Sequence, residues 1–169
     1  MEIKKYPLIF IVEDNTVYNK LIVNHLRFHK LTNIESFLSG ETCLKNIDRK
    51  PDIIIQDYLL EGINGIDVLK ATRKKYPDTE FIFLSGQIDI ELAINSMKYG
   101  AADYIIKDQY ALKKLTDKIK KIMFHHELIN SNKRYKLGIT LFFIALAAII
   151  LIFLSLTFIF PHTFSILGN

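Results

Sequence analysis

Short apolar runs alternate along this chain with longer segments in which apolar residues recur at helical spacing. The runs predict strands at Leu8–Val12, Asn33–Phe37, Asp52–Gln56, Glu80–Leu84 and Asp103–Ile106. The intervening segments predict helices at Thr16–His29, Gly40–Asp48, Gly65–Tyr76 and Asp89–Tyr99, and a last helix from about Gln109. This alternation indicates an α/β fold, a doubly wound (βα)5 parallel sheet with helices on both faces.

Apolar residues recur at helical spacing in these segments, and those of the last helix are expected to face the core. The apolar residues are Val17, Leu21, Ile22 and Leu26 in the first helix, Leu92, Ala93, Ile94 and Met97 in the fourth, and Leu112, Leu115, Ile119 and Ile122 in the last. A helix packed on a sheet presents such a stripe.

Four of the apolar runs stop at polar residues that suit phosphoryl chemistry. Glu13 and Asp14 follow the first run, Asp57 the third, Ser85 the fourth and Lys107 the fifth. Because the carboxyl ends of parallel strands share one edge of a sheet, these side chains should meet in one crevice. Three carboxylates close together repel one another unless a cation binds, and Mg²⁺ accepts carboxylate, carbonyl and water oxygens.

Each of these residues also has a purely structural explanation. The acidic pair Glu13–Asp14 can cap the first helix, and we expect one of the two to do so. Ser85 alone is a common turn residue, and Lys107 alone a common surface residue. The metal and phosphoryl interpretation is favoured because these residues follow different strands of one predicted sheet.

The last fifth of the chain differs in composition. No charged residue occurs between Leu137 and Phe160, and this stretch is long enough to cross a bilayer as a helix. Lys133, Arg134 and Lys136 precede it, which predicts a single-pass, C-terminal membrane anchor with the rest of the chain in the cytoplasm. The expected organisation is a domain at 1–129, a basic juxtamembrane segment at 130–136, a transmembrane helix at 137–160 and a short tail at 161–169.

Charge and cysteine content limit the other classes of function. Residues 109–136 hold eight Lys and Arg against two Asp and Glu, and this basic stretch beside the membrane favours anionic lipid over nucleic acid. The single Cys43 excludes an intramolecular disulfide and is expected to be a packing residue. His25 and His29 have a metal-binding spacing, but no third ligand is evident, so packing or solvated histidines are expected.

Residues 6–125 resemble the receiver domain of response regulators in two-component systems. The match rests on Glu13–Asp14, on Asp57 within IIIQDYLLEGINGID, on Ser85 followed by Gly86, and on the stretch Gly100–Lys107. The resemblance implies a flavodoxin-like strand order of 2-1-3-4-5. The sequence departs from the family's usual prolines at Glu61 and Asp108.

The resemblance also implies a role for each site residue. Asp57 is the expected phosphoacceptor, and Ser85 and Lys107 contact the phosphoryl group. Mg²⁺ is held by Asp14, Asp57 and the backbone carbonyl of Leu59, and Glu13 acts mainly through water.

Three further residues follow from the same resemblance. Tyr104 is the expected switch aromatic. The family places residues that influence hydrolysis of the acyl phosphate at the positions of Leu59 and Gln87. Because Leu59 cannot orient water, we expect a long-lived phosphoryl group.

These expectations together describe a membrane-anchored receiver that is not a turnover enzyme. A histidine kinase or phosphotransfer protein donates the phosphoryl group, and output is a contact with an unidentified protein at the membrane, or a homodimer through the face near Tyr104, without DNA-binding output. One alternative is a phosphorylation-independent scaffold at the membrane. A second is a metal-dependent aspartyl phosphatase, which usually has a second Asp where Leu59 stands.

Overall fold

The computed structural model describes residues 6–86 and 89–159, with the side chains of 130–134 and 157–159 left out of the description. The chain forms two compact units, Met1–Met123 and Phe124–Asn169.

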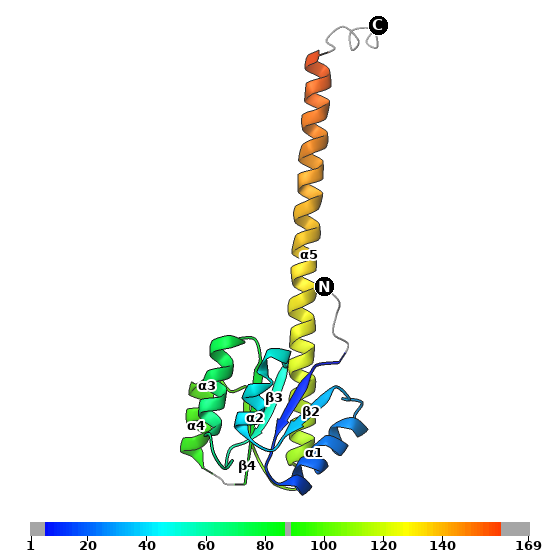
Figure 1. The fold of residues 1–169 in the computed structure, drawn as a ribbon. Helices are drawn as coiled ribbons and strands as arrows, with labels where there is room; N and C mark the ends of the chain where they lie inside the picture. The colour runs from blue at the N-terminus through cyan, green and yellow to red at the C-terminus, as the bar shows by residue number, and fades with distance from the viewer. Residues whose placement is uncertain (1–5, 87–88, 160–169) are drawn as a thin grey trace. The chain divides into compact units, whose positions relative to one another are not determined.

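The first unit is built on a parallel five-stranded sheet (Figure 1). Its strands are β1 (Ile9–Val12), β2 (Ile34–Phe37), β3 (Ile53–Asp57), β4 (Glu80–Ser85) and β5 (Asp103–Ile106). The strand order is β2-β1-β3-β4-β5, and all neighbouring pairs are parallel. The predicted doubly wound sheet and its order are therefore confirmed.

Helices follow the strands as the sequence predicts. They are α1 (Thr16–Phe28), α2 (Gly40–Lys45), a 3₁₀ turn η1 (Ile47–Arg49), α3 (Gly65–Lys75), α4 (Ile90–Lys98) and α5 (Ala111–Ile159). Two helix boundaries differ from the prediction by more than one residue. The second helix breaks at Asn46, and α5 begins at Ala111 because Asp108 first forms a local turn, accepting a hydrogen bond from the backbone N–H of Tyr110 at 2.8 Å.

Strand alternation divides the apolar side chains between two cores. Ile9, Ile11, Ile53 and Ile55 face α1 and α5, together with Leu84 and Ile105. Phe10, Val12, Ile54 and Phe83 face the opposite core with α2 and α3. Because both faces are covered, the strands are apolar almost throughout, which explains their continuous apolar runs.

The helix stripes are only partly buried. Ile22 and Leu26 of α1 are buried, as are Leu115, Ile119 and Ile122 of α5.

The exceptions lie on α1 and α4. Val17 and Leu21 are 76% and 48% exposed, and Ile94 and Met97 are also exposed. Apolar spacing therefore identifies these helices but does not by itself show which of their apolar residues face the sheet.

The second unit contains the apolar segment predicted to span a membrane. Tyr135–Leu156 is helical and has a mean hydropathy of 3.0, and the rest of the structure does not bury its residues. The expected span at 137–160 overlaps this segment, but residue 160 and the tail at 161–169 lie outside the described residues, as do the side chains of Lys133 and Arg134. The boundary at residue 129 stays a prediction.

Close contact at Gly65 fixes the start of α3 against the end of β3. A Cβ atom there would lie 2.9 Å from both Gln56 Nε2 and Phe83 Cε1, which are buried and cannot easily move. We expect Gly65→Ala to lower the free energy of unfolding by about 1–3 kcal/mol in urea titrations. Gly86→Ala is the control, since a Cβ there meets nothing within 4 Å, and it should change stability by no more than about 0.5 kcal/mol. Equal effects would contradict the packing argument.

Candidate functional site

Strand parity and register bring three charged residues to one corner of the sheet. Ile11 pairs with Ile55 between β1 and β3, so Glu13 and Asp57, two residues further on, lie side by side. Lys107 lies two residues beyond Ile105, on the same face of the sheet. The predicted meeting of Glu13, Asp57 and Lys107 at the carboxyl edge is thus observed.

Lys107 bridges the two buried carboxylates. Its Nζ lies 2.7 Å from Glu13 Oε2 and 2.6 Å from Asp57 Oδ2. Glu13 is only 1% exposed and Asp57 7%. Burial raises the pKa of the Glu13 carboxyl, and the Asp57 carboxylate raises it further, although the hydrogen bond from Lys107 acts in the opposite direction. Burial alone lowers the pKa of Lys107, but the hydrogen bonds to Asp57 and Glu13 outweigh it and raise that pKa.

Asp14 adds a third carboxylate at the exposed side of the same corner. One oxygen each of Glu13, Asp14 and Asp57 lies within 4.8 Å of the others. A single ammonium cannot balance three carboxylates, so this donor set fits a hard divalent cation such as Mg²⁺. The backbone N–H of Leu59 donates to Asp57 Oδ1 at 3.2 Å, which places Leu59 at the rim with its side chain exposed.

Ser85 and Tyr104 occupy different sides of this corner. Ser85 is buried at the end of β4, and its carbonyl accepts a 2.7 Å hydrogen bond from the backbone N–H of Lys107. Tyr104 lies on the opposite face, with its ring centroid 6.1 Å from that of Tyr58. Tyr58 in turn packs edge-on against Phe83 at 5.5 Å. The expected switch aromatic therefore belongs to an aromatic cluster behind the charged corner. Gln87 lies outside the described residues.

The helix cap expected from the acidic pair is formed by a different residue. Asn15 is the N-cap of α1, and its side chain accepts hydrogen bonds from the backbone N–H groups of Val17 and Tyr18. The prediction that Glu13 or Asp14 caps α1 was wrong. A cap preference for Asn immediately before a helical pattern was the signal available in the sequence.

Sequence reasoning also missed Tyr18. Lys107 Nζ lies 4.6 Å from the centroid of its ring, a cation–π contact that covers one side of the ammonium. Burial raises the pKa of the Tyr18 hydroxyl. Nothing in the α1 pattern marks this residue, because the contact joins α1 to the end of β5.

Two other candidates have structural roles. Cys43 is buried, and burial raises the pKa of its thiol to about 12, so it is a packing residue as expected. His25 hydrogen-bonds Thr116 of α5 at 3.0 Å and packs on His29. Within the described residues, the acidic corner is the one group of potential metal ligands found.

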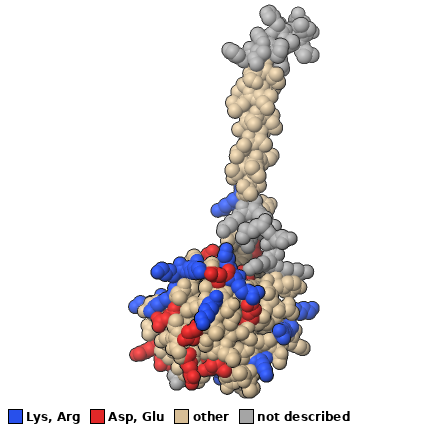
Figure 2. Space-filling view, in the orientation of Figure 1, with Lys and Arg blue, Asp and Glu red and all other residues tan. Residues whose placement is uncertain are grey.

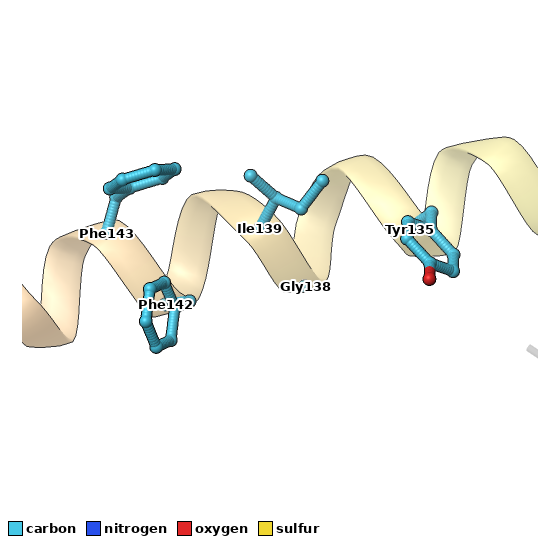
Figure 3. A pocket seen from close by; sticks show the side chains of 5 residues that line it. All are labelled: Tyr135, Gly138, Ile139, Phe142 and Phe143. Carbon is cyan, nitrogen blue, oxygen red and sulfur yellow. The ribbon is translucent and has the colours of Figure 1, made fainter.

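A shallow groove on the second unit carries no comparable chemistry. It surrounds Gly138 and is lined by Tyr135, Ile139, Phe142 and Phe143 (Figure 3). The Tyr135 hydroxyl is the one polar side-chain group among these five residues, so the groove offers no acid, base or nucleophile suited to catalysis.

Comparison with known proteins decides the family. The response regulator receiver domain family matches residues 9–120, about two thirds of the chain. The chain belongs to this family. The resemblance seen in the sequence is confirmed. Receiver domains are generally phosphoacceptors on an aspartate, bind Mg²⁺ in an acidic pocket and interact with histidine kinases or phosphotransfer proteins.

The receiver has relatives among regulatory proteins. It is 36% identical to the regulatory protein LuxO of Vibrio cholerae over 70 residues, which are 41% of this chain and 15% of LuxO. It is 33% identical to the transcriptional regulatory protein CssR of Bacillus subtilis over 100 residues, 59% of this chain and 44% of CssR. The receiver thus matches less than half the length of these relatives.

Solved structures agree with the fold. The signal receiver domain of a LuxO repressor protein from Vibrio parahaemolyticus has a TM-score of 0.67 and 25% identity, covering 74% of this chain and 95% of that one. A response regulator from Chloroflexus aurantiacus has a TM-score of 0.64 and 29% identity, covering 70% and 98%. These chains consist almost entirely of a receiver, so a unit of this size folds by itself.

Lys107→Met should make the stability of the receiver strongly pH-dependent. Without the ammonium, Glu13 and Asp57 repel each other, and the pKa of Glu13 rises further. A carboxyl whose pKa is raised in the folded state destabilises the fold as pH rises through that pKa. In EDTA, we expect the variant to lose little stability at pH 5 and about 3 kcal/mol at pH 8 in urea titrations.

Lys114→Met is the matched control. It removes an exposed ion pair in which Lys114 Nζ lies 2.7 Å from Asp108 Oδ2. Such pairs contribute at most about 1 kcal/mol to the free energy of unfolding at either pH. A Lys107→Met loss that is the same at both pH values would contradict the proposed charge balance.

Proposed function

We propose that the receiver accepts a phosphoryl group on Asp57 from a histidine kinase or phosphotransfer protein. The observation that carries this proposal is the meeting of Asp57 with Lys107, Glu13 and Asp14 at the edge where the strands end. Asp57 is the central one of these groups, since it is hydrogen-bonded to Lys107 and lies beside both other carboxylates. Its position at the end of β3 leaves its side chain partly accessible from the rim.

An Asp57 oxygen attacks phosphorus in this proposal, and the bond from phosphorus to the donor breaks. The donor's nitrogen or oxygen leaves with the bonding electrons, and an acyl phosphate remains. Lys107 holds negative charge on the transferred group, because its Nζ already lies 2.6 Å from Asp57. Ser85, at the end of the neighbouring strand, is the proposed hydroxyl donor to a phosphoryl oxygen.

Mg²⁺ fits the donor set of the site. Asp14, Asp57 and the Leu59 carbonyl are the proposed ligands, and Glu13 is proposed to act mainly through water. The cation supplies charge compensation that one ammonium cannot. Lys107 and the Asn15 backbone N–H hold the Glu13 carboxylate from two sides, at 2.7 and 3.3 Å.

The donor is proposed to dock on α1 beside the site. Val17 and Leu21 are exposed on this helix, although their apolar character predicts burial. They lie one to two turns from the charged corner, and exposed apolar side chains at such a position suit a protein contact.

Output is proposed to pass through α4 and the face near Tyr104. Tyr104 contacts Tyr58, the residue next to Asp57, so a change at the site can reach the Tyr104 ring through one aromatic neighbour. On α4, Ile90, Ile94 and Met97 are exposed. An apolar face of this kind fits a partner protein or a second copy of the receiver.

We further propose that the helical segment Tyr135–Leu156 anchors the receiver in a membrane, with the receiver in the cytoplasm. Its mean hydropathy of 3.0 and its exposed Leu, Ile and Phe side chains support this, because water would solvate them poorly. Lys136 near its start agrees with a cytoplasmic orientation.

Intact mass spectrometry tests the phosphorylation. Incubated with Mg²⁺ and acetyl phosphate, residues 1–129 should gain the mass of one phosphoryl group, and chelation of Mg²⁺ should prevent the gain. Asp57→Asn should show no gain, while Asp67→Asn, an exposed acid on α3, should behave as the native receiver. A folded receiver that gains no phosphoryl group from acetyl phosphate or from a cognate kinase would support the scaffold alternative.

Leu59→Asn should shorten the lifetime of the acyl phosphate. The exposed Leu59 side chain covers the rim without a polar group, whereas an amide at this position can orient a hydrolytic water. We expect decay of the phosphorylated variant, followed by loss of the added mass, to be about ten-fold faster, within the range of positioned proton and water catalysis. Leu59→Met preserves the apolar rim and serves as the control. An unchanged decay rate in Leu59→Asn would remove this role.

A further inference from the structure

Basic residues outnumber acidic ones at the edge of the receiver where the strands begin, although Asp48, Asp52, Asp78, Glu80 and Asp103 also lie there. Exposed lysines cluster where the strands begin and the helices end, and we call these six residues the basic edge: Lys30, Lys50, Lys74, Lys98, Lys120 and Lys121. Acidic residues collect where the strands end, among them Glu13, Asp14, Asp57, Glu61, Asp89 and Asp108. Figure 2 shows blue side chains, with some red ones among them, over the upper end of the receiver, which in this view is the end where the strands begin.

Contacts among the loops fix the basic edge as one surface. Lys75 and Tyr76, which end α3, both hydrogen-bond Asp48 of η1. Arg73 hydrogen-bonds the Gly100 carbonyl in the turn before β5. Lys118 pairs with Asp103, the first residue of β5, at 3.3 Å, which places the following turn of α5 at the same edge.

The six lysines have no structural partner that explains them. Neighbouring basic residues are paired, as Lys75 is with Asp48 and Arg49 with Glu35 at 2.9 Å. Among the described residues, the structure gives the six lysines no side-chain hydrogen bond or ion pair, although the backbone N–H groups of Lys30 and Lys50 donate to the carbonyls of Arg27 and Ile47. Lys74 and Lys98 lie in last turns of helices, where positive charge also stabilises the helix end. Lys30 and Lys50 also follow helical turns, α1 and η1, but Lys120 and Lys121 lie within α5, where that explanation does not apply.

Lys30 and Lys50 stand where the backbone favours glycine. Their φ angles are +64° and +56°, and they are the two non-glycine residues with positive φ among the described residues. A side chain in this region is strained, and glycine is the usual residue just after a helix in this conformation. At both positions the chain has a lysine despite this strain, which suggests that the charge itself is used.

We propose that the basic edge binds the anionic headgroups of a phospholipid bilayer. This rests on the proposed membrane anchor. α5 leaves the receiver at Met123, at the basic edge, and Tyr135 begins the apolar segment. The connecting chain can extend no more than about 40 Å, so the basic edge stays near the bilayer surface whatever the path between the units. The tether keeps the effective concentration of lipid high, so weak binding by a few lysines suffices.

Vesicle sedimentation tests the proposal with the isolated receiver. Residues 1–129 should pellet with vesicles that contain phosphatidylglycerol, remain in solution with phosphatidylcholine alone, and dissociate at high salt. Each lysine near an anionic surface strengthens partition by about five-fold. The double variant Lys30→Gly/Lys50→Gly should therefore bind about ten-fold or more weakly. Its thermal midpoint should be unchanged or higher, because glycine relieves the strain, so weaker binding cannot be ascribed to unfolding.

Matched variants distinguish binding through the basic edge from a general effect of net charge on binding. Lys20→Gln/Lys113→Gln removes the same two charges away from the edge and should bind within about two-fold of the native receiver. Lys30→Arg/Lys50→Arg should retain binding. The proposal is overturned if both charge-removing variants lose binding alike or if phosphatidylglycerol has no effect. It is also overturned if the receiver binds duplex DNA more tightly than the vesicles at the same salt, which would indicate a nucleic-acid partner.

Experiments on the full chain distinguish lipid binding by the basic edge from anchoring by the apolar helix. If alkaline carbonate releases the full chain from membranes, the anchor fails. If the full chain stays in the membrane, acetylation of Lys30 and Lys50 by an amine-reactive reagent should be slower in vesicles with phosphatidylglycerol than without, while Lys20 reacts equally in both. Equal acetylation of Lys30 and Lys50 in the two membranes would overturn the lipid contact and leave the anchor intact.

Discussion

Two buried carboxylates and one ammonium share a corner of the sheet, and the chemistry of the receiver depends on their balance. Glu13 and Asp57 have lost most of their water, which makes their mutual repulsion strong. Lys107 offsets part of it by bonding both. Asp14 adds a third carboxylate, which leaves the corner with excess negative charge that a divalent cation could balance. The proposed ion binding and the proposed phosphoryl transfer would thus depend on the same balance of charge.

The parallel register converts sequence order into this arrangement. Glu13, Asp57 and Lys107 each follow, by an even number of residues, a strand residue that faces the core with α1 and α5. A one-residue shift in any of the three would send its side chain to the other face. The same alternation places Tyr104 and Tyr58 behind the site. The charged corner and its aromatic neighbours are therefore separated by the sheet but joined through Asp57, the last residue of β3, and the adjacent Tyr58.

Most of the fold could be predicted from the sequence because strand burial and strand ends are local patterns. The strands, the α/β class and the meeting of Glu13, Asp57 and Lys107 follow from apolar runs and their polar ends. Long-range contacts could not be predicted this way. Tyr18 reaches Lys107 from α1, and nothing in the helical spacing of α1 distinguishes it from other stripe positions.

Apolar residues are usually buried, and positive φ angles usually belong to glycine. The exposed apolar residues and the strained lysines depart from these two tendencies, and no internal contact explains either. Val17 and Leu21 on α1, with Ile94 on α4, lower solubility without adding to the core. Lys30 adopts a backbone conformation that glycine would adopt with less strain. In a sequence otherwise consistent with its fold, such departures indicate external partners. The apolar ones lie on helix faces suited to proteins, and the cationic ones lie at the opposite edge from Asp57. In the arrangement that we propose, the receiver contacts a lipid surface at one end while Asp57 stays accessible to a soluble phosphodonor at the other.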